Sequence, residues 1–280
     1  MNELNFAVKH ADRVGVTRDL PYGPDELKRV ANSATLIYGE HDALLVDSFT
    51  TQAQNEELIE WIRSFGKQLK RIYITHGHGD HLFGLNQLMT AFPTAEAVAQ
   101  PNVIETAHFQ GSEAYMGSFW DALFPGQIAK PIVFPEPLDG DRLDIEGHEI
   151  RVIPTGYTDT EFTTAVWVPE LRLLVAGDVV YDDTHPYLAE ADHDTREAWA
   201  STLDQLQQLH PRTVVAGHGW PGKTVGAEAI DATAAYLRDF NTEADRTSTA
   251  RDLFDAMMLK YGTRRNPGSL WGGAKRAKSS

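Results

Sequence analysis

The chain of 280 residues contains no cysteine, and basic side chains are scarce. Without cysteine, disulfides and thiolate metal sites are both excluded, so any metal must be held by nitrogen and oxygen. The 25 Lys and Arg stand against 40 Asp and Glu, a formal net charge of −15. Because a phosphate backbone attracts a basic surface, we do not expect nucleic acid to be a partner.

Long apolar runs are also missing, since no stretch approaches the roughly 20 residues of a membrane-spanning helix. The opening MNELNFAVKHADR lacks the basic and then apolar pattern of a signal peptide. We therefore expect a cytoplasmic protein without membrane contact, whose partner is a small-molecule substrate.

Hydrophobic residues make up 42% and charged residues 23%, an ordinary globular balance. The length suffices for one domain over 1–280 with a well-buried core.

Hydrophobic patterning predicts strands and helices in alternation. Strands are expected within 33–49 on both sides of a turn at Gly39–Asp42, and at 70–75, 95–100, 141–155, 163–169, 171–178 and 213–217. Helices are expected at 51–66, 80–92, 198–209, 231–246 and 250–262. The order helix, strand, histidine loop occurs in both 56–78 and 198–219, which indicates two similar halves.

Two segments remain open between alternatives. The aromatic segment 103–135 is either a lid over a pocket or a helix-rich connection with its aromatics in the core. The C-terminal helix and tail, 245–280, contain Arg264 and Arg265 followed by NPGSLW. This tail caps the pocket, docks on another subunit of a homo-oligomer, or is an unstructured end.

The stretch THGHGDH, residues 75–81, places three histidines and an aspartate after a buried strand. Crowded imidazoles are costly without a cation to satisfy them. Gly77 and Gly79 allow sharp turns, so alternate side chains can converge. The stretch therefore predicts a metal site.

Two further candidates follow strands later in the chain. Asp178 stands in VAGDVVY and His218 in VVAGHGW, each after an apolar run and a glycine. Either residue alone could be a backbone cap or a surface group. Together with the first cluster, both are expected to be metal ligands, because ligand sites form at strand ends.

With these residues, the sequence resembles the metallo-β-lactamase fold superfamily over roughly residues 30–240. The family pattern is H-x-H-x-D-H, a glycine–histidine loop, a bridging aspartate and a last histidine. The resemblance implies an α/β fold, a four-layer αββα sandwich of two mixed sheets flanked by helices, with a dinuclear metal site at one edge. It implies His76 and His78 at the first metal, Asp80, His81 and His218 at the second, and Asp178 as the bridge.

The departure from the family pattern is Tyr157, which stands in TGYTDT where the family has a histidine. The ring could swing aside and leave the first metal two histidines and water, or its phenolate could bind the metal. The first site could also stay empty; a weakened first site is the favoured expectation. Tyr157 could instead donate a hydrogen bond to a developing oxyanion. Asp159, in the same loop, is a further candidate for the missing ligand.

The donor types suit Zn²⁺, one or two ions, while iron and manganese are alternatives. The implied chemistry is attack of metal-bound hydroxide on a small ester, lactone, thioester or lactam, with Asp80 orienting the hydroxide and shuttling its proton. His185 and Trp220 are expected to bind substrate. The lack of cysteine and of a signal pattern argues against a secreted class B lactamase. The alternatives are a degenerate site that binds a ligand or partner without turnover, and an iron-dependent redox enzyme.

Overall fold

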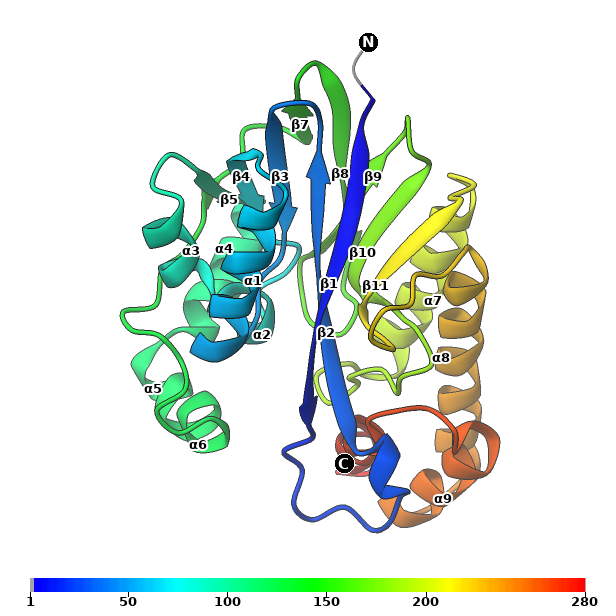
Figure 1. Ribbon diagram of the computed structural model, residues 1–280. Helices are drawn as coiled ribbons and strands as arrows, with labels where there is room; N and C mark the ends of the chain where they lie inside the picture. The colour runs from blue at the N-terminus through cyan, green and yellow to red at the C-terminus, as the bar shows by residue number, and fades with distance from the viewer. Residues whose placement is uncertain (1–2, 280) are drawn as a thin grey trace.

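An eleven-stranded mixed sheet runs through the protein, as seen in a computed structural model (Figure 1). The structure describes residues 3–279; residues 1, 2 and 280, at the ends of the expected domain and tail, lie outside the described residues. The strands are β1 (Asn5–Val14), β2 (Arg29–Tyr38), β3 (Asp42–Val46), β4 (Gln68–Tyr73), β5 (Glu96–Ala99), β6 (Glu136–Pro137), β7 (Arg142–Ile145), β8 (His148–Gly156), β9 (Thr163–Val168), β10 (Leu173–Tyr181) and β11 (Thr213–His218). Their order is β6-β5-β4-β3-β2-β11-β10-β9-β8-β7, with β1 paired to β2.

Helices lie in two groups on opposite sides of this sheet (Figure 1). The first group is α1 (Gln52–Ser64), α2 (Gly79–Leu82), α3 (Leu85–Ala91), α4 (Pro101–Gln110), α5 (Glu113–Tyr115), the π-helical turn η2 (Met116–Trp120) and α6 (Asp121–Leu123). The second group is α7 (His193–Gln207), α8 (Glu228–Arg246), α9 (Ala250–Tyr261) and α10 (Pro267–Ala277). A short 3₁₀ turn, η1 (Asp25–Leu27), precedes β2. Among residues 3–279, no helix combines the length and apolar character needed to cross a bilayer.

Three buried clusters show the layers. One lies between the first helix group and the sheet and includes Leu58 and Ile72. Another lies between the sheet and the second group and includes Trp199. The third consists of strand residues from both halves of the sheet, such as Leu44 and Val166, which pack face to face. The expected four-layer αββα fold is therefore confirmed, with both sheets belonging to one curled hydrogen-bonded sheet.

The two halves of the sheet join where β2 meets β11. This antiparallel link consists of one residue pair, Asn32 with His218. Strands β10 and β11 run parallel, so their C-terminal ends, with Tyr181 opposite His218, lie at the same edge. The chain after β4 reaches this edge as well, because Thr164 donates its backbone N–H to the Thr75 carbonyl at 3.0 Å. The fold thus brings three separate strand ends to one place.

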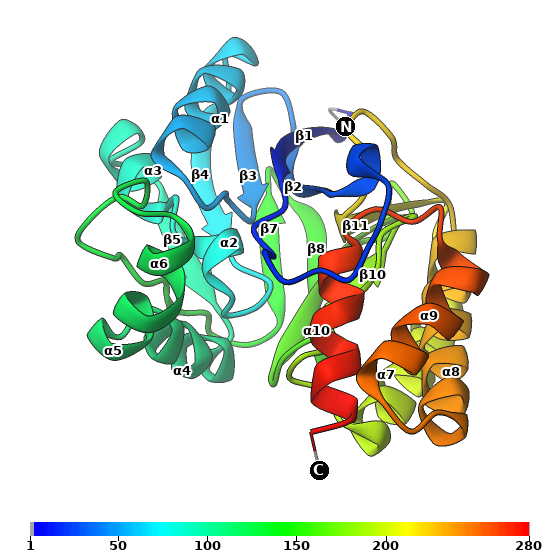
Figure 2. The same ribbon diagram turned by 90° about the horizontal axis from the view of Figure 1, so that it is seen from below.

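Most expected elements are present, with two differences. The helix expected over 80–92 is two helices, α2 and α3, separated at Phe83 and Gly84. Strand β1 was not expected, although it pairs with β2 along ten residues. The tail forms α10, which lies on the side of the second helix group that faces the first, beside the β1–β2 connection (Figure 2). Pro267 stands in the first turn of α10, where its missing N–H costs nothing.

Candidate metal centre

The loop that follows β4 brings four polar side chains into the interior. His76, His78 and His81 are buried, and Asp80 lies in the first turn of α2. The loop lies tight against its neighbours: a Cβ on Gly77 would be 2.6 Å from the Thr106 side chain, and one on Gly79 would overlap the Phe83 ring. Glycine is therefore required at both positions by space.

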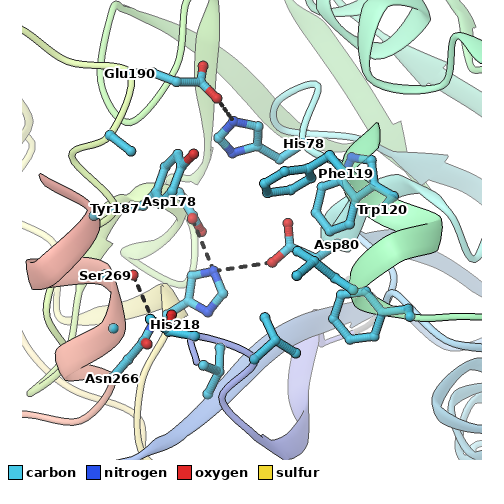
Figure 3. A pocket seen from close by; sticks show the side chains of 18 of the residues that line it. His78, Asp80, Phe119, Trp120, Asp178, Tyr187, Glu190, His218, Asn266 and Ser269 are labelled. Carbon is cyan, nitrogen blue, oxygen red and sulfur yellow. Dashed lines mark hydrogen bonds and ion pairs between the residues drawn. The ribbon is translucent and has the colours of Figure 1, made fainter. Parts of the chain in front are cut away.

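Asp178 and His218 meet this loop from the ends of β10 and β11. Asp178 lies between two imidazoles, with Oδ1 3.2 Å from His81 Nε2 and Oδ2 3.1 Å from His218 Nε2. Asp80 Oδ2 is 3.6 Å from the same His218 nitrogen. Figure 3 shows Asp178 and Asp80 both directed toward the same ring nitrogen of His218. The structure thus brings together all six residues that the family pattern predicted as ligands.

Each of the four imidazoles is anchored at one ring nitrogen by an oxygen outside the cluster. The pairs are His76 Nδ1 with Thr75 Oγ1 at 3.0 Å, His81 Nδ1 with Asp47 Oδ2 at 3.1 Å, His218 Nδ1 with the Ala31 carbonyl at 3.2 Å, and His78 Nε2 with Glu190 Oε1 at 3.1 Å. An N–H donated outward leaves the other nitrogen with a free lone pair that faces inward. This is the arrangement of metal-ligating histidines.

Tyr157 does not reach the cluster. Its hydroxyl donates to the Glu190 carbonyl at 3.1 Å, and burial raises the pKa of the phenol above its ordinary value, which opposes a phenolate ligand. The ring has swung aside, as one of the expected alternatives has it. With its proton donated to a carbonyl oxygen, the hydroxyl is also not placed as an oxyanion donor.

Asp159 takes the position that Tyr157 leaves. Its Oδ2 lies 2.8 Å from His78 Nδ1 and 3.6 Å from His76 Nε2, and the side chain is fully buried. Thr158 fixes the other carboxylate oxygen by donating to Oδ1 at 2.9 Å. Asp159 therefore lies where it could supply a third protein ligand beside the bridge, as another of the expected alternatives has it.

The residues present fit a pair of cations. One group of ligand atoms within 4.8 Å of one another comes from His76, His78, Asp159 and Asp178, and another from Asp80, His81 and His218. Among the atoms of residues 3–279, His76 Nε2 is buried without a hydrogen-bond partner. An unpartnered buried polar atom is costly, and a bound cation beside it would remove that cost.

The pKa shifts of His76 and Asp178 agree with this interpretation, whereas those of His78 and His81 do not. Burial alone would lower the pKa of both rings, but Asp159 beside His78 and Asp178 beside His81 raise it well above its ordinary value, so a metal would have to displace a proton from each ring. Burial lowers the pKa of His76, and the neighbouring His81 lowers it further, which keeps the ring neutral as a ligand requires. Burial alone would raise the pKa of Asp178, but His218 and His81 outweigh it and hold that pKa well below its ordinary range. Neutral imidazole and ionised carboxylate are the forms that bind metal.

A cavity of about 600 Å³ opens beside the cluster, and His78, Asp80, Asp178 and His218 form part of its wall. Phe119 and Trp120, from the aromatic segment 103–135, face it from one side, and Asn266 and Ser269, around the start of α10, from the other (Figure 3). The C-terminal tail thus contributes to the pocket wall, which was one of its three expected roles.

Two expected pocket residues lie elsewhere. His185 is fully buried away from the cavity, with Nδ1 2.8 Å from the Tyr236 hydroxyl. Trp220 is partly exposed, and its ring lies under the Arg265 guanidinium at 4.9 Å. Neither lines the cavity beside the metal centre. Closeness in sequence to Asp178 and His218 did not place them near the site, because the chain turns away after each strand.

Comparison with known proteins gives one family. A family model described as the metallo-beta-lactamase superfamily matches residues 27–218. The metallo-beta-lactamase type 2 of Bacteroides fragilis is 23% identical over 214 residues, which are 75% of this chain and 77% of that protein.

Solved structures share the fold. A metallo-beta-lactamase family protein from Thermus thermophilus has a TM-score of 0.65 and 21% identity, covering 96% of this chain and 91% of its own. A metallo-beta-lactamase from Pontibacter korlensis has a TM-score of 0.62 and 18% identity, covering 85% of this chain and 100% of its own. At such identities the likeness shows the fold alone.

Proposed function

Because the chain belongs to the metallo-β-lactamase superfamily, we propose that it is a metal-dependent hydrolase of a small ester, lactone, thioester or lactam. One fold carries many reactions, so the argument must come from the site. The observation that supports the proposal is the convergence of four anchored imidazoles and three carboxylates in one space, with His76 Nε2 buried and unpartnered among the described residues.

We propose zinc as the metal, with iron and manganese as alternatives, since imidazole and carboxylate without thiolate suit all three. His76, His78 and Asp159 would hold one ion, Asp80, His81 and His218 the other, and Asp178 would lie between them. When bound, such a cation lowers the pKa of coordinated water to about 7 and polarises a substrate oxygen.

Asp80 is proposed to move the proton. Burial would raise the pKa of its carboxyl, but His81 and His218 outweigh burial and hold it below its ordinary value. Its Oδ2 accepts a hydrogen bond from Asn32 Nδ2 at 2.9 Å, which fixes the carboxylate at the cavity wall. Asp80 would accept a proton as the water oxygen bonds to the carbonyl carbon. It would then pass the proton to the leaving oxygen, sulfur or nitrogen.

The volume and lining of the cavity restrict the size and polarity of the substrate. A volume of about 600 Å³ is typical of pockets for small molecules. Tyr115, Phe119, Trp120 and Tyr187 line it, so the non-reacting part of the substrate is expected to be apolar or aromatic. The segment 103–135, which supplies three of these rings, is proposed to act as one side of a lid.

The test combines metal analysis with a substrate panel. The purified protein is analysed for zinc, iron and manganese, and then assayed on aryl esters, lactones, thioesters and lactams, before and after chelation. We expect close to two ions per chain and turnover that chelation abolishes and added metal restores. Metal-loaded Asp80→Asn, with the same shape and no base, should lose at least about 100-fold in kcat.

Each contrary result points to a different function. Stoichiometric metal without turnover on any of the four classes would support a binding protein, and iron without hydrolysis would support a redox enzyme. Absence of bound metal under saturating zinc would overturn the proposal at its base.

A further inference from the structure

Arg13, at the end of β1, places a cation with buried nitrogens beside the cavity. Its side chain lines the cavity, and among the atoms of residues 3–279 its Nε and Nη1 are buried without a hydrogen-bond partner. The adjacent Asp12 does not neutralise it, because that carboxylate is paired with Arg29 at 2.6 Å and with Arg265. Asp80 and Asp12 act on the guanidinium through space, but neither offers a hydrogen-bond acceptor to Nε or Nη1. Buried donors without an acceptor are costly, and an anion that enters the cavity would supply one.

The other cations of the cavity wall differ from Arg13. Lys275 of α10 is 2.6 Å from the Asp19 carboxylate, so its charge is already paired. Arg18 is exposed to water. Arg13 is therefore the wall cation whose buried nitrogens have no partner within the described part of the chain.

The surroundings of Arg13 define what fits there. Its Cζ lies 5.0 Å from the centroid of the Phe124 ring, which lines the same cavity, so apolar surface and positive charge are adjacent. A planar guanidinium presents parallel N–H donors that match a carboxylate. The protein as a whole carries a charge of −15 and repels anions, so an anionic ligand requires such a local cation.

We propose that Arg13 binds a carboxylate on the substrate, so that the substrate is an apolar or aromatic ester, lactone, thioester or lactam that carries a free carboxylate away from the scissile bond. This inference rests on the proposed function for the identity of the reacting group. It places the reacting carbonyl at the Asp80 side of the cavity and the carboxylate at the β1 side. Arg13 is then a substrate-binding residue that selects anionic over neutral substrates.

The first experiment measures binding and needs no turnover. Calorimetry compares 4-phenylbutyrate with its neutral amide on the metal-loaded wild type, on Arg13→Met and on Arg18→Met. We expect the wild type to bind the carboxylate about 10- to 100-fold more tightly than the amide, as for a hydrogen bond to a charged group. Arg13→Met should lose that preference. Arg18→Met removes the same charge from the same segment and should keep it.

Three outcomes would overturn the inference. The wild type could bind both ligands equally. The preference could survive in Arg13→Met, which would mean that the carboxylate binds the metals instead. Arg18→Met could lose as much of the preference for the carboxylate as Arg13→Met, which would mean that the preference comes from the overall electrostatic field and not from contact with Arg13. If circular dichroism shows that Arg13→Met does not fold, Arg13→Lys is tested instead. Lysine keeps the positive charge but lacks the paired N–H donors of the guanidinium, so this variant should retain part of the preference for the carboxylate.

A kinetic version separates this inference from the proposed function. The substrates are 4-nitrophenyl hydrogen glutarate and 4-nitrophenyl pentanoate, which differ in the terminal carboxylate. Arg13→Met should raise KM about 10-fold or more for the first and leave the second unchanged. If neither ester is turned over by the wild type while the calorimetric preference stands, the hydrolase proposal fails and the anion site remains. If both esters are turned over with equal KM, the anion site fails and the hydrolase remains.

Discussion

Asp159 Oδ2 lies 2.8 Å from the Nδ1 atom of His78, two residues along the chain from Tyr157, where the family pattern has a histidine. As a metal ligand, Asp159 would replace a neutral donor by a charged one. The first metal position would then have two imidazoles, one carboxylate and the neighbouring Asp178. This set carries more negative charge than three imidazoles beside Asp178 would. Oxygen donors are also harder than nitrogen, so the position should accept manganese or iron more readily than an all-imidazole site.

The first prediction concerns the residues that hold this position. Asp159→Ala should reduce bound metal from about two ions per chain toward one, because the first position keeps only two imidazoles beside the bridge. Tyr157→Phe and Tyr157→His should leave the metal content unchanged, because the ring lies aside and Asp159 fills the place. Elemental analysis after dialysis against a competing chelator measures this. A gain of metal in Tyr157→His would show that the tyrosine, rather than Asp159, limits the position.

The second prediction concerns Glu190, whose Oε1 fixes His78 Nε2 at 3.1 Å and whose Oε2 accepts from Thr160 at 2.6 Å. Outer carboxylates that orient a ligating histidine typically change metal affinity by about 10- to 100-fold. Glu190→Ala should therefore weaken one of the two metals by that factor in competition titrations. Glu161→Ala removes an exposed carboxylate from the same region and should have no effect. Equal titration curves for the two variants would show that Glu190 does not support metal binding.

The strand and loop positions of the ligands were predictable because they follow local rules. An apolar run before THGHGDH and before Asp178 and His218 gives buried strands that end in polar loops. Convergence of these ends could be expected from the family resemblance. The helices at 51–66 and 231–246 show strong apolar periodicity and were found nearly as expected, as α1 and α8.

Other features depend on tertiary contacts that a sequence does not display. Asp47 and Glu190 anchor His81 and His78 from distances of 34 and 112 residues along the chain. Asp47 also has a φ of 63°, which marks a turn directly after β3 but gives no sign of its partner. Asp159 was only one of several candidates, since nothing in TGYTDT tells which side chain turns inward. Arg13 lies in a strand that was not expected.

The third prediction concerns Gly217, next to the last ligand. A Cβ at this position would overlap Asp178 Oδ1 and lie 2.6 Å from the Gly177 carbonyl carbon. Gly217→Ala must therefore displace Asp178, and overpacking of this kind typically costs about 1–3 kcal/mol. Urea unfolding of the metal-free protein should show the loss, and metal titration should show weaker binding. Gly117→Ala has open space around its Cβ and is the matched control. Wild-type behaviour of Gly217→Ala would mean that Asp178 has room to move.

The last prediction concerns acid stability and His185. Burial, with a smaller effect of Arg264, lowers the pKa of His185 from 6.5 to about 3. Below pH 6.5 the unfolded chain takes up this proton and the folded chain does not, so stability is lost between about pH 6.5 and 3 and is unaffected above that range. Each pH unit in this range costs roughly 1.4 kcal/mol, so the free energy of unfolding should fall by about 2–3 kcal/mol because of His185 between about pH 7.5 and 4.5.

His185→Gln keeps a polar group near Tyr236 without the proton uptake, so the variant should lose less stability on acidification than the wild type. Urea unfolding of metal-free samples at both pH values measures the difference and avoids metal release. His193→Gln, an exposed histidine at the start of α7, should follow the wild type. The same acid loss in His185→Gln would mean that His185 is protonated in the folded protein, and that its burial beside Tyr236 is relieved by water.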